Sequence, residues 1–138
     1  MDSSPSRGPE DVISRWDEVF TALSAEPRRQ IVDALIDVPP GEPVSLPETA
    51  ASANGGTDFD RLRLQLQHRH LPLLEANGFV QWESDPLRAY RGRDFEEVAI
   101  VLESLYANAE EIPDRLVVGC QTLEYELESG NSGCELSG

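Results

Sequence analysis

The sequence predicts a mainly α-helical domain that carries one small β-hairpin, which places it in the α+β class. Apolar side chains recur at helical spacing in several segments, of which the longest runs from Asp58 to Asn77 and stops at Gly78. Two short β-prone runs follow, one on each side of a turn that contains Pro86, and a last helical segment comes after them. The predicted order is therefore four helices, a hairpin and a fifth helix.

The first two predicted helices are short and adjoin each other. Six apolar side chains share one face of the first helix, residues 11–24: Val12, Ile13, Trp16, Val19, Phe20 and Leu23. The second helix covers residues 27–37 and is expected to be capped by Ser24. Its inward side chains are predicted to be Ile31, Leu35 and Ile36. Arg28 and Arg29 are expected on its outer face.

A loop and a short helix separate this pair from the long segment. Residues 38–43 contain three prolines and a glycine, so no helix crosses them. Residues 44–46 are expected to form a short strand, and residues 46–52 a short third helix. A glycine-rich turn at residues 53–57 then leads into the fourth helix.

The fourth helix, Asp58–Asn77, has two distinct faces. Five positions form a continuous inward stripe: Leu62, Leu66, His70, Leu73 and Leu74. Long polar side chains cluster roughly opposite: Arg61, Gln65, His68 and Arg69. Thr57 or Asp58 is expected to cap the helix, and Gly78 to end it in a left-handed conformation. Because Pro72 would cost a straight α-helix about 3 kcal/mol, a kink or break is expected near residues 68–72.

The hairpin and the last helix complete the domain. Strands are expected at residues 79–83 and 88–91. The fifth helix is expected at Asp94–Asn108, with Asp94 as its cap.

The segments outside this core have a different composition. Residues 1–10 and 128–138 are rich in small and polar side chains and are expected to be disordered. Residues 111–127 form an ambiguous extension that fits either a strand or a short helix. The folded domain is therefore expected to span residues 11–110.

The charge of the chain is strongly acidic. It has 26 acidic residues against 11 basic ones, every one of them arginine, for a net charge of −15. Acid excess without lysine suits a protein dissolved in concentrated salt, where the Debye length falls to about 3 Å. An acidic protein with disordered ends in an ordinary cytosol is the alternative. No apolar run is long enough to span a membrane, so we expect a cytoplasmic protein with no membrane contact.

The sequence offers little for catalysis or metal binding. Residues 55–57 are too short for a phosphate-binding loop. His68 and His70 point apart on a helix, and His70 is expected to be a buried structural residue. Cys120 and Cys134 lack metal-ligand spacing and are expected to be free thiols, with a disulfide as the alternative. We therefore expect no enzyme activity, no metal and no cofactor.

The order of helices around the hairpin is that of a winged helix-turn-helix domain. Residues 23–35, LSAEPRRQIVDAL, resemble the second helix of ArsR-like transcriptional regulators. Residues 70–80, HLPLLEANGFV, resemble the passage from recognition helix to wing in the same family. Together with the lysine-free acidity, the chain is similar to small winged-helix proteins of haloarchaea. The resemblance covers about Val12 to Asn108.

This resemblance implies a homodimer that inserts the fourth helix into the major groove of double-stranded DNA and lays the hairpin beside it. The side chains facing DNA would be Arg61, Gln65, His68 and Arg69 on the helix and Arg88, Arg91 and Arg93 on the wing. The first and fifth helices would join the two copies through Trp16, Phe20, Val98, Leu102, Leu105 and Tyr106. The chain lacks the cysteine pairs of metal-sensing members, so the resemblance does not imply metal sensing.

A protein-interaction module with the same fold is the alternative function. Arg69 stands where the family commonly has serine or threonine, and Pro72 interrupts the helix that would read the bases. In this alternative the acidic surface or the C-terminal tail binds a protein partner, and the chain makes no direct contact with DNA.

Overall fold

The computed structural model describes residues 9–50 and 58–117. This part of the chain is mainly helical and contains a small antiparallel sheet of three strands, which agrees with the predicted α+β class. The expectations for the N-terminal segment, the glycine-rich turn, the two cysteines and the C-terminal tail lie outside the described residues, except at the edges of those segments.

The first two helices, α1 (Pro9–Ala22) and α2 (Glu26–Asp37), lie within about two residues of the expected bounds. The cap of α2 differs from the prediction, because Ala25 occupies the N-cap position and offers no side-chain hydrogen bond. The hydroxyl of Ser24 instead donates to the carbonyl of Thr21 at 2.7 Å.

The long segment is one continuous helix of changing pitch, which we call the long helix (Phe59–Ala76). It consists of α3 (Phe59–Gln65), a π-helical turn η2 (Leu66–His70) and α4 (Leu71–Ala76). Asp58 caps it as expected, accepting the backbone N–H of Arg61 at 3.1 Å. The disturbance predicted near residues 68–72 is this π turn, in which the N–H of Leu71 bonds the carbonyl of Leu66 five residues earlier.

The inward stripe of the long helix is largely as predicted. Leu62, Leu66, His70 and Leu74 are buried, while Leu73 is only half-buried. Leu71 is buried although the α-helical pattern does not place it inward. The π turn adds one residue to the helix, so the pattern of faces changes after His70.

The sheet joins three short strands in the order β1-β3-β2. The hairpin consists of β2 (Val80–Ser84) and β3 (Leu87–Arg91), and β1 (Val44–Ser45) pairs with the other edge of β3. The described part of the third predicted helix forms a 3-10 turn, η1 (Glu48–Ala50), and its last two residues, 51–52, lie outside the described residues. Before β2, Gly78 has a φ of +79°, as expected for a left-handed helix end.

The C-terminal part contains α5 (Phe95–Ala107), a 3-10 turn η3 (Ala109–Glu111) and the short helix α6 (Asp114–Val117). Asp94 stands at the N-cap of α5, but its carboxylate makes no capping bond. The start of the ambiguous extension is therefore helical, and the rest of it is not described.

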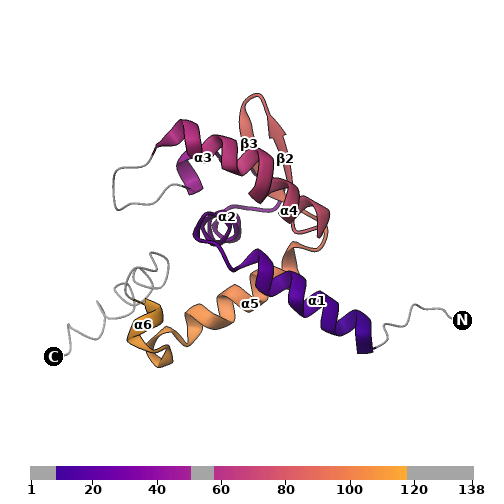
Figure 1. Cartoon of the computed structure of the whole chain (residues 1–138), viewed down its shortest axis with the longest axis vertical. Coiled ribbons are helices and arrows are strands. Elements are labelled where there is room, and N and C mark those ends of the chain that lie inside the picture. Colours follow the sequence, from indigo (N-terminus) through magenta and orange to yellow (C-terminus); the bar gives the residue numbers. More distant parts are fainter. Residues whose placement is uncertain (1–8, 51–57, 118–138) are drawn as a thin grey trace, which may run out of the picture.

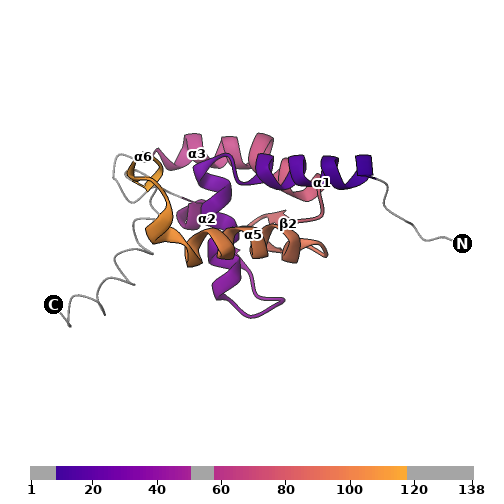
Figure 2. The ribbon, with the colours of Figure 1, turned by 90° about the horizontal axis from the view of Figure 1, so that it is seen from below.

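The elements pack around α2 (Figure 1). This helix lies between the long helix on one side and α5 on the other. α1 crosses α5, and the hairpin projects beside the long helix. Turned by 90°, the molecule shows α6 at the end farthest from the start of α1 (Figure 2). No helix in the described ranges is long and apolar enough to cross a membrane.

Candidate nucleic-acid interface

The outward face of the long helix is exposed and locally basic. Arg61, Gln65, His68 and Arg69 are all exposed, as predicted. No hydrogen bond or ion pair engages these four side chains within the described parts of the chain. Residues 59–70 contain three arginines and one aspartate, so their net charge is +2 with histidine neutral, in a chain of −15. We call these four side chains the polar face.

Arg63 links the long helix to the hairpin. Its Nη2 donates to the carbonyl of Ser84 at 3.3 Å, at the turn of the hairpin. Helical spacing alone does not identify this contact, because it depends on where the hairpin folds back. The contact helps to hold the hairpin beside the long helix.

The charge of Arg88 is balanced within the hairpin. Its guanidinium pairs with Glu83 on the neighbouring strand, with 2.6 Å between Nη2 and Oε2. The hydroxyl of Tyr90 donates to the same carboxylate at 2.8 Å. The hydrogen bond from Tyr90, followed by that from Arg88, lowers the pKa of Glu83. The hydrogen bond between Tyr90 and Glu83 also raises the pKa of Tyr90. Glu83 therefore stays ionised beside Arg88.

Arg91 does not face outward with the other hairpin arginines, which corrects its predicted place in the DNA-facing set. Its guanidinium donates to the carbonyls of Leu35 at 3.1 Å and Val38 at 3.0 Å, at the end of α2. It also lies 5.1 Å from the ring centre of Phe95. These carbonyls lack partners within their own helix, so Arg91 closes the C-terminus of α2. Arg93, in contrast, is 88% exposed and lies 3.5 Å from Asp94.

A buried pair connects the π turn to the junction of α1 and α2. Arg28, expected outside, is buried, and its Nη1 lies 2.7 Å from Nδ1 of His70. Because arginine can only donate, Nδ1 accepts and His70 is neutral with its proton on Nε2. The same guanidinium donates to the carbonyls of Ala22 at 3.0 Å and Thr21 at 2.9 Å. Burial, followed by the charges of Arg28 and Arg69, lowers the pKa of His70 to about 4.

The residues predicted to join two copies divide into two groups. Trp16 and Phe20 are 49% and 57% exposed, and their rings stack with 5.5 Å between centroids. Val98 and Leu102 are 0% and 1% exposed, so they belong to the core and not to a docking surface, which corrects the prediction. The reason is that the inward face of α5 packs against α2. Leu105 is exposed, and Tyr106 is half-buried against the core.

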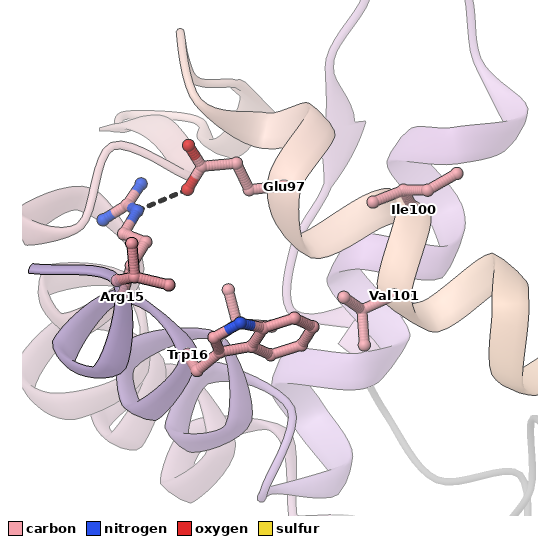
Figure 3. Close-up of a pocket in the computed structure, with 7 residues that line it drawn as sticks. Arg15, Trp16, Glu97, Ile100 and Val101 are labelled. Carbon is pink, nitrogen blue, oxygen red and sulfur yellow. Dashed lines mark hydrogen bonds and ion pairs between the residues drawn. The ribbon is translucent and has the colours of Figure 1, made fainter. Parts of the chain in front are cut away.

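Six apolar side chains of α1 and α5 are exposed, and we call this set the α1–α5 face: Val12, Ile13, Trp16, Phe20, Ile100 and Leu105. Val12, Trp16 and Ile100 line one cavity, and Phe20 stacks on Trp16. A cavity of about 280 Å³ opens between the two helices. Figure 3 shows Trp16 of α1 opposite Ile100 and Val101 of α5, with the ion pair of Arg15 and Glu97 at one side.

The described residues contain no group of three or more His, Cys, Asp or Glu side chains that could hold a metal ion. Comparisons of the chain with protein-family models, with curated proteins and with solved structures give no match.

Proposed function

We propose that the protein is a dimeric, sequence-specific regulator that binds double-stranded DNA through a winged helix-turn-helix. In this proposal the long helix enters the major groove and the hairpin is the wing. The observation that carries the proposal is the polar face, which combines a local charge of +2 with exposed side chains that have no partner in the described parts of the chain.

The chemistry of the polar face suits base recognition. Arg61 can make two hydrogen bonds to guanine, and Gln65 can make two to adenine. They are four residues apart and share one face of α3. His68 and Arg69 extend this face into the π turn. The net charge of the whole chain, −15, repels DNA at long range, and concentrated salt screens that repulsion over a few ångströms.

In this proposal the hairpin contributes fewer arginines to DNA contact than the sequence suggests. Arg93 is available to contact phosphates, and Arg88 reaches them only together with its partner Glu83. Arg91 has no place in this contact set, because its guanidinium holds the end of α2.

Dimerisation through the α1–α5 face would place two long helices against successive major-groove half-sites. A twofold symmetric pair of this kind reads half-sites about 34 Å apart along the duplex. The face combines a stacked aromatic pair with a cavity that a second copy can fill.

The test begins by selecting duplexes that bind the protein from a randomised library in molar salt, where non-specific attraction is weak. Affinity for the selected duplex is then measured by fluorescence anisotropy. We expect Arg61→Ala and Gln65→Ala each to weaken binding by about 5- to 150-fold, corresponding to the loss of one bidentate base contact. Thermal unfolding should stay unchanged.

Arg115→Ala is the matched control, since it removes one exposed arginine from α6, away from the polar face. Its affinity should equal that of the wild type. The site assignment is wrong if both polar-face variants bind as tightly as this control.

A specific observation also favours the protein-interaction module. Phe59 and Leu64 are exposed on the same helix that carries the polar face, and large apolar side chains are common in protein interfaces. If no duplex is enriched from the library, this second function becomes the better explanation of the exposed surface.

A further inference from the structure

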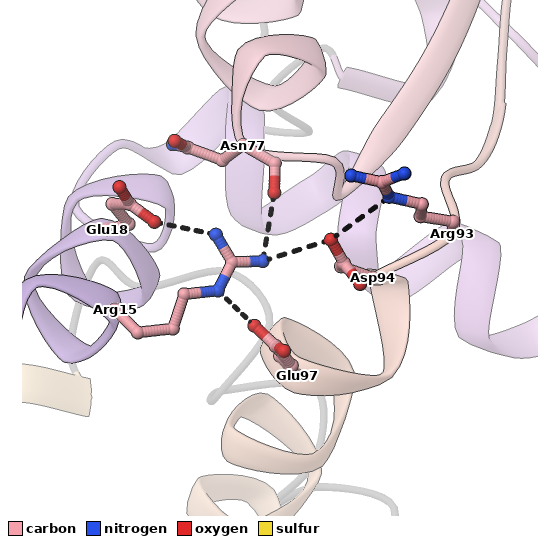
Figure 4. Close-up of polar contacts among 6 residues, drawn as sticks. All are labelled: Arg15, Glu18, Asn77, Arg93, Asp94 and Glu97. Carbon is pink, nitrogen blue, oxygen red and sulfur yellow. Dashed lines mark hydrogen bonds and ion pairs between the residues drawn. The ribbon is translucent and has the colours of Figure 1, made fainter. Parts of the chain in front are cut away.

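Arg15 of α1 contacts several elements at one point (Figure 4). Its Nη1 donates to Glu18 at 2.6 Å, its Nε pairs with Glu97, and its Nη2 donates to the carbonyl of Asn77 at 2.9 Å. The same Nη2 lies 3.4 Å from Asp94. These contacts use all three guanidinium nitrogens, which a single lysine ammonium does not reproduce.

Arg15 contacts the elements proposed to bind DNA through Asn77 and Phe79, and it contacts α5 through Asp94 and Glu97. Asn77 follows the last residue of the long helix, and Phe79 leads into the hairpin, with its ring centre 4.8 Å from the guanidinium carbon. Asp94 and Glu97 lie at the start of α5. One side chain from α1 therefore holds the end of the long helix, the base of the hairpin and the start of α5 together.

The backbone at this junction leaves little room for independent movement. The N–H of Asp94 donates to the carbonyl of Gly78 at 2.8 Å, and that of Gly92 to Phe79 at 2.9 Å. A Cβ atom on Gly92 would clash with the carbonyl oxygen of Gly78. Because residues 78–79 and residues 92–94 approach so closely, a displacement of the start of α5 also displaces the base of the hairpin.

The other side of Arg15 borders the α1–α5 face. Arg15 and Glu97 line the same cavity as Trp16 and Ile100 (Figure 3). The guanidinium thus lies between the surface proposed for dimerisation and the elements proposed to contact DNA.

We propose that Arg15 is a positioning residue that couples the α1–α5 face to the long helix and the hairpin. A second copy docked on that face sets the position of α1 relative to α5, and the bonds of Arg15 carry this position to Asn77 and the base of the hairpin. The inference rests on the proposed function, because it requires the dimer, but it makes a claim that can be tested without DNA.

The two tryptophans of the chain allow a direct test. Trp16 lies on the α1–α5 face, and Trp82 lies where the hairpin meets the long helix, donating from Nε1 to Glu75 at 3.0 Å. Protein labelled with 5-fluorotryptophan gives one fluorine NMR resonance for each. Ile13→Glu places a charge on the exposed face and is used to separate the dimer, as checked by light scattering.

We expect Ile13→Glu to shift both resonances when Arg15 is present. In an Arg15→Gln background, the same substitution should shift Trp16 and leave Trp82 unchanged. Glu18→Gln is the matched control, since it weakens in the same way the contact of Arg15 that stays within α1, and it should retain both shifts. Glu97→Gln weakens the contact from α5 while keeping Arg15, and it should reduce the Trp82 shift even if Arg15→Gln does not fold.

The outcomes separate the two proposals. A monomeric wild type at every concentration overturns the dimer and the coupling together. A dimer that separates without any shift of Trp82, or with equal shifts in wild type and Glu97→Gln, overturns the coupling alone and leaves DNA binding to its own test.

Discussion

Arg28 and Arg91 show how arginines are used inside this fold. Arg28 donates to two carbonyls at the end of α1, and Arg91 donates to carbonyls at the end of α2. The last turn of a helix leaves its carbonyls without partners and carries a partial negative charge, so a cation there is favourable. A long side chain can reach such carbonyls from another element, and its helical position alone does not reveal this.

The pair of Arg28 and His70 gives a prediction for the dependence of stability on pH. The folded pKa of His70 is about 4, below its ordinary value of 6.5, so the unfolded chain binds the proton more readily between these values. The stabilisation is therefore complete above about pH 6.5 and is lost as the pH falls towards 4. From about pH 7.5 to about pH 5.5 the wild type should lose about 1.4 kcal/mol more unfolding free energy than His70→Gln.

The measurement is chemical unfolding in molar salt at both pH values. Glutamine at position 70 still offers Arg28 an acceptor but does not titrate. His68→Gln is the control, because His68 is exposed, and it should keep the wild-type dependence. Equal losses in wild type and His70→Gln would rule out this origin of the pH dependence.

At the scale of the element, the long helix accommodates a proline by changing its pitch. A proline inside a straight α-helix removes a hydrogen bond and clashes with the preceding turn. Here the N–H of Leu71 already bonds the carbonyl of Leu66, five residues earlier, and Pro72 falls at the start of α4. The wider π turn removes most of the conflict, and it also presents His68 and Arg69 outward while His70 points inward.

Pro72→Ala tests this account of the long helix. If the π turn already accommodates the ring, the substitution should change the free energy of unfolding by less than about 1 kcal/mol. A gain of about 3 kcal/mol would instead indicate a strained α-helix. Chemical unfolding measures the difference, and Pro39→Ala in the exposed loop reports how much of it arises in the unfolded chain.

At the scale of the whole molecule, α5 separates a core from an outer surface. Its inner side chains, including Val98 and Leu102, pack against α2, while Ile100 and Leu105 remain exposed. Together with the stacked rings on α1, these side chains give a protein of net charge −15 an exposed apolar surface. Exposed apolar patches commonly mark interfaces with other proteins, which favours a dimer.

Phe20→Glu should therefore yield a monomer without unfolding the chain, since Phe20 is exposed and its ring lies on the α1–α5 face. We expect light scattering in molar salt to give twice the monomer mass for the wild type and the single mass for the variant. Ser14→Glu adds the same charge to an exposed position of α1 and should remain a dimer. A wild type of single mass would refute dimerisation.

Much of the candidate site was predictable because it follows from local pattern. Helical spacing separates the buried Leu62, Leu66 and Leu74 from the exposed polar face, and Gly78 marks the end of the long helix. The structure corrects the predicted functions of Arg91, Val98 and Leu102, because each function depends on which neighbouring element contacts the side chain. The neighbouring element is determined by contacts between residues that are far apart in the sequence.

By itself, the sequence determined the α+β class, the order of the elements and the exposed polar face, since all three arise from residue spacing of a few positions. Only the tertiary structure decided that Arg28 pairs with His70, that Arg91 closes α2 and that Arg15 joins α1 to Asn77 and Glu97. These bonds join residues that are 42 to 82 positions apart in the sequence. Their geometry exists only once the helices and the hairpin have packed together.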